Sequence, residues 1–338
     1  MPFGLFTEYL FFCRNILNMW LNSLLLIIGL WILIKGAGWL VNGSSVLAKR
    51  YRVSDLVIGL TIVSFGTSAP ELVVSLIASA EQLNDIVLGN VMGSNIANLF
   101  LILGISGLIF PLTVEKSTIR IEIPLSLLAA IILFFLANNF FLVDKPVISR
   151  IDGLILLLFF GGFLVYVFHM SKKKRPIEKF TVSQIPAYKA GLIVIAGLAA
   201  LIVGGKLVVD NAVKLAQFIG ISEKIIGFTI IAVGTSLPEL ATSVVAAMKK
   251  NPEIAVGNII GSNIFNIFLI LGTSSVVSPI AYNKAFNPDF YLLAAGTILL
   301  LVFVFTGRKY RLDRGEAAIL LLIYLGYITW LILKETIA

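Results

Sequence analysis

Two motifs occur twice in this chain, and each second copy lies 168 residues after the first without a gap. Residues 59–72 share 9 of 14 positions with residues 227–240. Residues 89–104 share 12 of 16 positions with residues 257–272. Chance and shared composition cannot keep one register over both motifs. The chain therefore consists of two copies of one structural unit, and any fold must accommodate both.

Long apolar runs indicate what kind of unit this is. Hydrophobic residues make up 59% of the chain and charged residues 13%, whereas soluble domains carry about 25% charged residues. A membrane-spanning helix needs about 20 mostly apolar residues. Such runs occur at 24–42, 56–79, 86–111, 123–143, 151–170, 190–209, 225–248, 254–280, 290–306 and 317–333. We therefore predict an all-α polytopic membrane protein with ten transmembrane helices, which excludes a soluble enzyme.

The number of spans between the copies sets their orientation. Five spans separate each motif from its copy, and because five is odd, the copies cross the membrane in opposite directions. Inverted-topology repeats of this kind hold substrate near the bilayer midplane, where the halves meet. We predict a first repeat over residues 23–170, a short basic loop over 171–189 and a second repeat over 190–338. Residues 1–22 contain too short an apolar stretch to span, so we predict an interfacial N-terminal lead-in.

The basic residues predict which loops face the cytoplasm. Of the 26 Lys and Arg residues, 17 fall in loops after odd-numbered spans and 7 on the other side, termini included. Cytoplasmic loops are enriched in Lys and Arg. We therefore predict a multi-pass protein of the cell membrane, with both termini extracellular and the Lys172–Arg175 loop cytoplasmic. The net charge of +8 is then a topology signal, and nucleic acid is not an expected partner.

Glycine and proline interrupt two of the predicted spans. Gly66 is followed by Pro70, and Gly234 is followed by Pro238, in the middle of apolar runs. Proline has no N–H and clashes with the preceding turn of a helix, which frees the carbonyl four residues earlier. At membrane depth such carbonyls are tolerated only where they line a polar cavity. The sequence therefore predicts two broken helices beside a cavity that binds cations.

Glu71 and Glu239, which occupy equivalent positions in the repeat, are the only acidic residues well inside the apolar runs. A carboxylate at the bilayer centre costs about 2.5–3.5 kcal/mol on insertion scales. No basic residue has an obvious place beside them in the sequence. The partner that neutralises them is therefore expected to be an imported cation. The alternative is a pair of protonated acids that only pack the helices together.

Other oxygen-bearing side chains recur around the two acids. Each glutamate follows a threonine by four residues and a serine by three, on one helix face. In the second motif Asn, Ser and Asn recur four residues apart. These side chains are Thr67, Ser68, Thr235, Ser236, Asn90, Ser94, Asn98, Asn258, Ser262 and Asn266. Ca²⁺ takes about six to eight oxygen ligands, and the lack of His and Cys in the motifs argues against zinc or copper. Bonding between helices is an equal alternative to ligation for Asn90, Asn95, Asn258 and Asn263.

A known family carries the same paired motifs. The chain resembles the sodium/calcium exchanger family, within the cation/calcium exchanger superfamily, in its two alpha repeats. The matching segments are Gly66-Thr-Ser-Ala-Pro-Glu71, Gly234-Thr-Ser-Leu-Pro-Glu239, Gly93-Ser-Asn-Ile-Ala-Asn98 and Gly261-Ser-Asn-Ile-Phe-Asn266. The short central loop makes the chain similar to the prokaryotic members of the family.

This resemblance implies a cluster of four cation sites between the second, third, seventh and eighth spans. Glu71 and Glu239 would bind both Ca²⁺ and Na⁺, and Thr67 and Thr235 would contribute to the calcium site. The flanking sodium sites would use the side chains of Ser68, Ser94, Ser236 and Ser262 and the backbone carbonyls of Ser64 and Ala232. The middle position would be lined by Asn98 and Asn266. Potassium-dependent exchangers carry Asp there, so potassium coupling is not expected.

The resemblance also implies an activity. It is that of a secondary active antiporter exchanging Na⁺ for Ca²⁺ by alternating access, and three Na⁺ per Ca²⁺ would move one net charge per cycle. The resemblance does not imply an enzyme, a cofactor other than the transported ions or an obligatory protein partner; the lipid bilayer is the expected surrounding. A Ca²⁺/H⁺ antiporter of the same superfamily is the alternative, although such relatives carry a Gly-Asn-Ala-Ala-Glu-like motif here. A cation channel is a more distant alternative.

Overall fold

The structure is a computed structural model that describes residues 3–138, 146–172, 185–219, 232–306 and 308–337. In this part of the chain, eight helices are long and apolar enough to cross a membrane, and one bent helix pair is a further candidate. The described residues therefore form a helical, multi-pass membrane protein. The seventh predicted span, 225–248, lies partly outside the described residues, so the total of ten stays a prediction.

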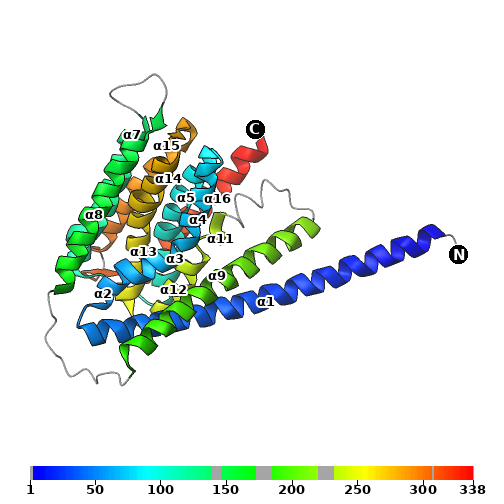
Figure 1. The fold of residues 1–338 in the computed structure, drawn as a ribbon, viewed down its shortest axis with the longest axis horizontal. Coiled ribbons are helices and arrows are strands. Elements are labelled where there is room, and N and C mark those ends of the chain that lie inside the picture. The colour runs from blue at the N-terminus through cyan, green and yellow to red at the C-terminus, as the bar shows by residue number, and fades with distance from the viewer. Residues whose placement is uncertain (1–2, 139–145, 173–184, 220–231, 307, 338) are drawn as a thin grey trace.

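The first helix is much longer than a membrane requires. α1 (Phe3–Tyr51) is one continuous helix of 49 residues, or about 74 Å at 1.5 Å per residue. The apolar part of a bilayer is about 30 Å thick. Figure 1 shows the N-terminal end of α1 reaching far beyond the other helices. The predicted boundary at residue 22 falls inside this helix, and the interfacial position of residues 1–22 stays a prediction.

Glycines fix α1 against α9 (Ala187–Phe218), which runs beside it in the opposite direction (Figure 1). A Cβ atom on Gly197 would lie 2.7 Å from the Leu40 nitrogen and 2.9 Å from the Gly36 carbonyl oxygen. A Cβ atom on Gly204 would lie 2.7 Å from the Leu33 nitrogen. Small residues let membrane helices approach this closely, and the close backbone contact then holds the pair together.

The second predicted span is broken where the Gly66 to Pro70 interval predicts a break. Its first segment consists of α2 (Asp55–Ile58), the π-helix η1 (Gly59–Val63) and α3 (Ser64–Thr67). α4 (Ala69–Ala80) follows after a bend of 46°. In the second repeat α11 (Ala232–Gly234) ends and α12 (Leu237–Met248) begins across Thr235 and Ser236. Ser68 and Ser236, the residues just before α4 and α12, have nearly the same backbone angles, with φ of −83° and −86°.

The third and eighth spans form the most buried part of the bundle and share a second irregularity. The third consists of α5 (Asn84–Ile96), the π-helix η2 (Ala97–Ile102) and α6 (Leu103–Ile109). The eighth consists of α13 (Pro252–Ile264), the π-helix η5 (Phe265–Leu271) and α14 (Gly272–Val277). Asn98 and Asn266 are the second residues of these π-helices. π-Helical turns are rare and occur frequently at functional sites.

Short strands tie the loops together at the two ends of the bundle. The remaining helices are η3 (Thr118–Glu122), α7 (Ile123–Asn138), α8 (Arg150–Lys172), η6 (Lys284–Phe286), α15 (Asn287–Phe303) and α16 (Arg314–Ile337). β1 (Leu112–Thr113) pairs with β4 (Arg311–Leu312), and β2 (Val147–Ile148) pairs with β3 (Ile280–Ala281). β1 and β4 follow the third and ninth predicted spans, β2 follows the fourth, and β3 lies at the end of the eighth, so the predicted alternation of sides would put the two strands of each pair on one face.

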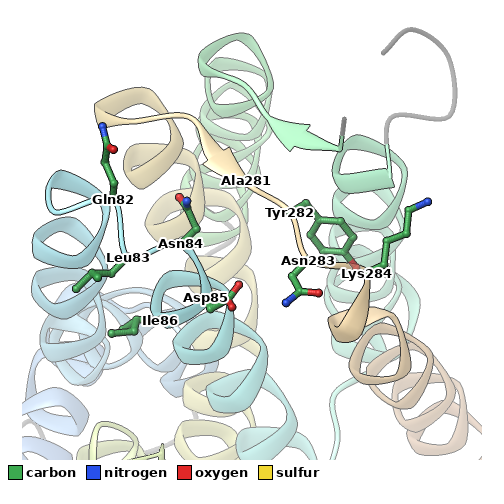
Figure 2. A pocket seen from close by; sticks show the side chains of 9 residues that line it. All are labelled: Gln82, Leu83, Asn84, Asp85, Ile86, Ala281, Tyr282, Asn283 and Lys284. Atoms are coloured by element: carbon green, nitrogen blue, oxygen red, sulfur yellow. The ribbon is translucent and has the colours of Figure 1, made fainter. Parts of the chain in front are cut away.

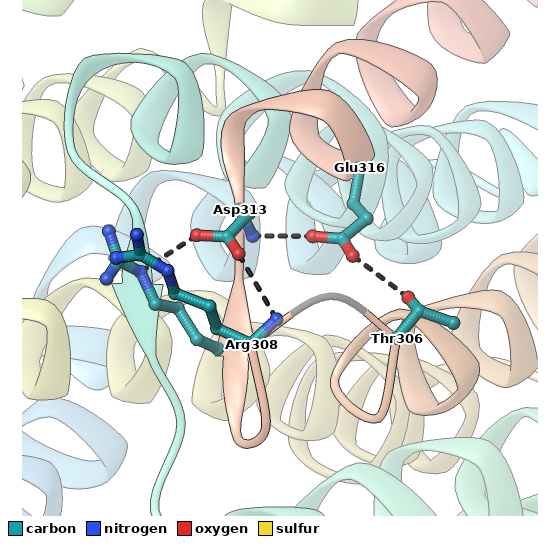
Figure 3. Close-up of polar contacts among 5 residues, drawn as sticks. Thr306, Arg308, Asp313 and Glu316 are labelled. Carbon is teal, nitrogen blue, oxygen red and sulfur yellow. Dashed lines mark hydrogen bonds and ion pairs between the residues drawn. The ribbon is translucent and has the colours of Figure 1, made fainter.

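A polar network orders the loop that leads into α16 (Figure 3). Thr306 Oγ1 donates to Glu316 Oε1 at 2.9 Å, and the Asp313 backbone N–H donates to Glu316 Oε2 at 2.6 Å. The Asp313 carboxylate accepts the Arg308 backbone N–H at 3.4 Å and pairs with Arg311 Nε at 2.9 Å. Such side chains satisfy backbone groups that a helix N-terminus leaves without partners. The network includes no residue of the predicted cation site.

Candidate cation-binding site

Glu71 and Glu239 meet at the helix breaks of the two repeats. Each lies in the first turn of the helix after its break, and each is 1% exposed. Ser68 Oγ donates to Glu239 Oε1 at 2.8 Å, and Ser236 Oγ donates to Glu71 Oε1 at 3.3 Å. The serine of each break therefore contacts the glutamate of the other. The two halves build one site, as the inverted repeat predicts.

The serines of the second motif extend this arrangement. Ser68 Oγ lies 3.0 Å from Ser262 Oγ, and Ser236 Oγ lies at the same distance from Ser94 Oγ, within hydrogen-bond range. Ser262 Oγ also lies 3.4 Å from Glu239 Oε1. Ser94 comes from α5 and Ser262 from α13, so hydroxyls from the third and eighth spans stand beside the carboxylates. All four predicted serine ligands thus belong to one cluster.

The threonines are held by asparagines of the opposite repeat. Thr67 Oγ1 donates to Asn258 Oδ1 at 3.1 Å, and Thr235 Oγ1 donates to Asn90 Oδ1 at 3.3 Å. Asn90 Nδ2 in turn donates to the Glu71 carbonyl at 3.1 Å. The sequence leaves cation ligation and bonding between helices open for Asn90 and Asn258. In the structure, both side chains make hydrogen bonds between helices. These bonds fix the threonines next to the glutamates.

Asn98 and Asn266 bond across the two halves of the chain. Asn98 Nδ2 donates to Asn263 Oδ1 at 3.1 Å, and Asn266 Nδ2 donates to Asn95 Oδ1 at 3.0 Å. Both donors are 1% exposed. Because their amide nitrogens are used in this way, their amide oxygens remain available for another partner.

Four buried oxygens of the cluster have no hydrogen-bond partner among the described residues. They are Glu71 Oε2, Glu239 Oε2, Asn98 Oδ1 and Asn266 Oδ1. Burying a polar or charged group without a partner is costly, and buried polar atoms are nearly always satisfied. Within the described part of the chain, neither glutamate is neutralised by an ion pair. Oxygens that lack donors are what a hard cation such as Ca²⁺ or Na⁺ binds.

The cluster differs from a site made of charged ligands alone. Among the described residues, no group of three or more His, Cys, Asp or Glu side chains could hold a metal ion. Two carboxylates with surrounding hydroxyl and amide oxygens therefore carry a formal charge of −2. Neutral oxygens fill calcium sites in many proteins together with a few carboxylates. A low charge suits ions that must also leave.

Ser64 and Ala232 occupy equivalent positions ahead of the two breaks. The Ser64 carbonyl accepts the Ser68 backbone N–H at 2.9 Å, and the Ser64 hydroxyl donates to the Gly59 carbonyl at 2.6 Å. Ala232 is the first residue of α11. Both residues lie on the segments that lead to the cluster, and their role as carbonyl ligands for Na⁺ stays a prediction.

A cavity of about 460 Å³ adjoins the cluster. Its lining includes Pro70 of α4, Thr235 and Pro238 of the second break, and Lys206 and Asp210 of α9. Because Thr235 also bonds to Asn90, which donates to the Glu71 carbonyl, the cavity borders the cluster on the side of α9.

A second cavity, of about 610 Å³, lies between two loops and includes none of the cluster residues. It is lined by residues 82–86, before and within the start of α5, and by residues 281–284, after β3. In Figure 2 the side chains of Asp85 and Asn283 face each other across this space, while Lys284 points away. Asp85 is exposed. This cavity is separate from the site of the paired glutamates.

The structure buries two acids that the sequence prediction left out. Glu122, in η3, is 0% exposed, and Asp289, in α15, is 9% exposed. Tyr166 of α8 donates a hydrogen bond to Glu122, and Tyr327 of α16 donates to Asp289 at 2.7 Å. Glu71 and Glu239 are therefore not the only buried acids, although they remain the only ones that the sequence places well inside an apolar run. Both additional acids stand at the start of an apolar run, where sequence alone places an acid at the membrane surface.

Comparisons with known proteins give the family of the chain. The sequence profile described as Sodium/calcium exchanger protein matches residues 21–169 and 189–333. The sodium/calcium exchanger MaX1 of Methanosarcina acetivorans is 33% identical over 346 residues, which cover 91% of this chain and 97% of the relative. The inner membrane protein YrbG of Escherichia coli (strain K12) is 36% identical over 323 residues, which cover 93% and 96%.

The fold agrees with this assignment. It is similar to a solved structure of the sodium-calcium exchanger NCX_Mj soaked with 10 mM Na⁺ and zero Ca²⁺, with a TM-score of 0.79 and 33% identity. The match covers 92% of this chain and 99% of that chain. The family match spans both repeats, and the structure unites their motifs in one buried cluster of oxygens. The chain belongs to the sodium/calcium exchanger family and is a membrane antiporter of that family.

Proposed function

We propose that this antiporter exchanges Na⁺ for Ca²⁺ at the cluster built by Glu71 and Glu239. The observation that carries the proposal is the set of four buried oxygens without hydrogen-bond partners, two from the glutamates and two from Asn98 and Asn266. The relatives with sodium and calcium in their names support the choice of ions. The ions are the substrates, and no resident cofactor is part of the proposal.

The hydrogen bonds of the cluster support distinct roles for its residues. We propose that Ca²⁺ is bound by both carboxylates with help from Thr67 and Thr235. Na⁺ would use the same carboxylates together with the serine hydroxyls and two backbone carbonyls. The residues proposed for the sodium positions are Ser68, Ser94, Ser236, Ser262, Ser64 and Ala232. Asn98 and Asn266 would line the middle position, which therefore carries no charge of its own.

Charge balance then makes exchange obligatory. One Ca²⁺ neutralises the formal charge of −2, and Na⁺ ions on the same oxygens do so in its place. Because the ligands are shared, the two kinds of ion cannot bind together. An empty site with two buried negative charges is costly to carry through a low-dielectric barrier. If three Na⁺ replace one Ca²⁺, one net charge crosses per cycle, which is about 2.3 kcal/mol per 100 mV.

The proposal includes an architecture. It has two inverted repeats of five spans, residues 23–170 and 190–338, joined by the basic loop 171–189 on the cytoplasmic side. Most of that loop, residues 173–184, lies outside the described residues. Both termini would be extracellular, because the Lys and Arg residues gather in the loops of the opposite face. Neither an enzymatic activity nor an obligatory protein partner is part of the proposal.

Flux into proteoliposomes tests the coupling ion. With the pH equal on both sides, loading the vesicles with Na⁺ and diluting them into Na⁺-free buffer containing ⁴⁵Ca²⁺ is expected to drive uptake. Replacing internal Na⁺ with K⁺ is the matched control and should give only background. Uptake that ignores the Na⁺ gradient but follows an imposed pH gradient would contradict the proposal and identify a Ca²⁺/H⁺ antiporter. Flux without any counter-ion would identify a channel.

A further inference from the structure

The two repeats have the same motifs but do not pack in the same way. In the first, Val73 and Val74 of α4 are 55% and 37% exposed, and both line the cavity of about 460 Å³ between α4 and α9. Their counterparts 168 residues later, Ala241 and Thr242 of α12, are 9% and 0% exposed. α12 packs against α1. The side of the site between α4 and α9 is therefore open, and the equivalent side between α12 and α1 is closed.

A lysine spans the closed side. Lys249, the residue after α12, donates from Nζ to the Gly38 carbonyl at 2.9 Å and to Asn42 Oδ1 at 2.7 Å, both on α1. A Cβ atom at position 38 would lie 3.8 Å from the lysine nitrogen, an ordinary van der Waals distance, so this contact does not depend on glycine. Burial lowers the pKa of the Lys249 ammonium, so the group is partly removed from water. One side chain thus ties the end of α12 to the C-terminal third of α1.

The repeat places charged residues at the same three positions on the open side. Position 249 corresponds to Glu81, which follows α4, and position 38 corresponds to Lys206 on α9. Position 42 corresponds to Asp210. Lys206 and Asp210 line the open cavity. The side chains of Glu81 and Lys206 make no hydrogen bond or ion pair with other described residues. The charges are reversed between the two sides. On the closed side the lysine follows α12 and its acceptors lie on α1, whereas on the open side the acid follows α4 and the lysine lies on α9.

We infer that Lys249 latches α1 to α12 in the state seen here, and that Glu81 pairs with Lys206 when the opposite side closes. Transporters built from inverted repeats alternate by rocking or gating one repeat or bundle against the other around the fixed site. If the two halves exchange their packing here, α9 closes over α4 and α1 separates from α12. The contact made by Lys249 would break, and its counterpart would form between Glu81 and Lys206. This inference rests on the proposed exchange function, because alternating access is what makes both states necessary.

The latch is tested by measuring which side is open, without measuring transport. In a Cys13→Ser background, a cysteine at Val73 reports the open cavity through its rate of labelling by a water-soluble maleimide. Lys249→Met removes the donor and keeps a similar length, and we expect it to slow labelling about fivefold by favouring the other state. Lys250→Met is the matched control and should leave the rate unchanged. Equal labelling in wild type and Lys249→Met would overturn the role of Lys249.

The counterpart pair is tested by exchanging its charges. Glu81→Gln and Lys206→Gln are each expected to lower the exchange rate about fivefold, and the double swap Glu81→Lys with Lys206→Glu is expected to restore it. A cysteine at position 81 and one at position 206 should form a disulfide more readily in the Lys249→Met background than with Lys249 present. A swap no better than the single variants, with no change in crosslinking, would overturn the pairing. Because labelling and crosslinking need no ion flux, this failure differs from failure of the exchange function.

Discussion

Replacing Glu71 or Glu239 by glutamine is expected to abolish calcium exchange while the protein stays folded. Glutamine has nearly the same shape and can still accept the serine hydroxyl that each glutamate accepts now. It removes one of the two negative charges, so the site can no longer neutralise Ca²⁺. Uncoupling a buried charge from its partner costs about 3 kcal/mol or more, which corresponds to about a 100-fold loss of calcium affinity.

Calcium uptake by proteoliposomes and the thermal unfolding midpoint of the purified protein would be measured on both variants. Glu122→Gln is the matched control, because Glu122 is also fully buried but lies outside the cluster and bonds to Tyr166. We expect exchange to persist in that control and unfolding to remain cooperative in all three. Near-normal uptake in Glu71→Gln or Glu239→Gln would remove both acids from the proposed role.

Gly197→Val is expected to have the largest effect on stability. The new Cβ atom would lie 2.7 Å from the Leu40 nitrogen and 2.9 Å from the Gly36 carbonyl oxygen. These are backbone atoms of α1, so no side chain can rotate away, and the two helices must separate. Overpacking of this kind typically costs about 1–3 kcal/mol, and losing the close α1–α9 contact adds to that cost.

Gly191→Val on the same helix is the control for this prediction. A Cβ atom there meets nothing within 4 Å, while the intrinsic helix preference of the substitution is the same. The thermal midpoint in detergent should fall by several degrees for Gly197→Val relative to Gly191→Val, as expected for a loss of about 1–3 kcal/mol. Equal midpoints for the two variants would mean that the close glycine contact does not hold α1 to α9.

Much of the site could be predicted because the repeat carries its own symmetry. The odd number of spans between the copies requires opposite orientations, and the break at Ser68 lies where proline removes a backbone donor. Glu71 and Glu239 stand out because each is an acidic residue in the middle of an apolar run. A motif whose two copies cross the membrane in opposite directions is therefore expected to bring its two acids together. In the structure, each glutamate accepts a hydrogen bond from the serine of the other break.

Other features depend on packing that periodicity does not encode. Asn90 has donor and acceptor groups that suit a cation or another helix equally, and only the positions of Thr235 and Glu71 decide for the second. Glu122 stands at the edge of an apolar run, where exposure and burial look alike in sequence. Tyr166, on a different helix, makes its burial tolerable. The different packing of α4 and α12 likewise does not follow from the repeat, because the shared motif gives both helices the same proline and glutamate at their start.

Equilibrium binding of ⁴⁵Ca²⁺ to the purified protein tests the central claim most directly. At constant pH, Na⁺ should displace the bound Ca²⁺ with a Hill coefficient above one, because several Na⁺ ions replace one Ca²⁺ on shared oxygens. The variant carrying Glu71→Gln and Glu239→Gln together should bind no Ca²⁺ in the same range. Calcium binding that is indifferent to Na⁺, or that persists in the double variant, would contradict competition at this pair of glutamates.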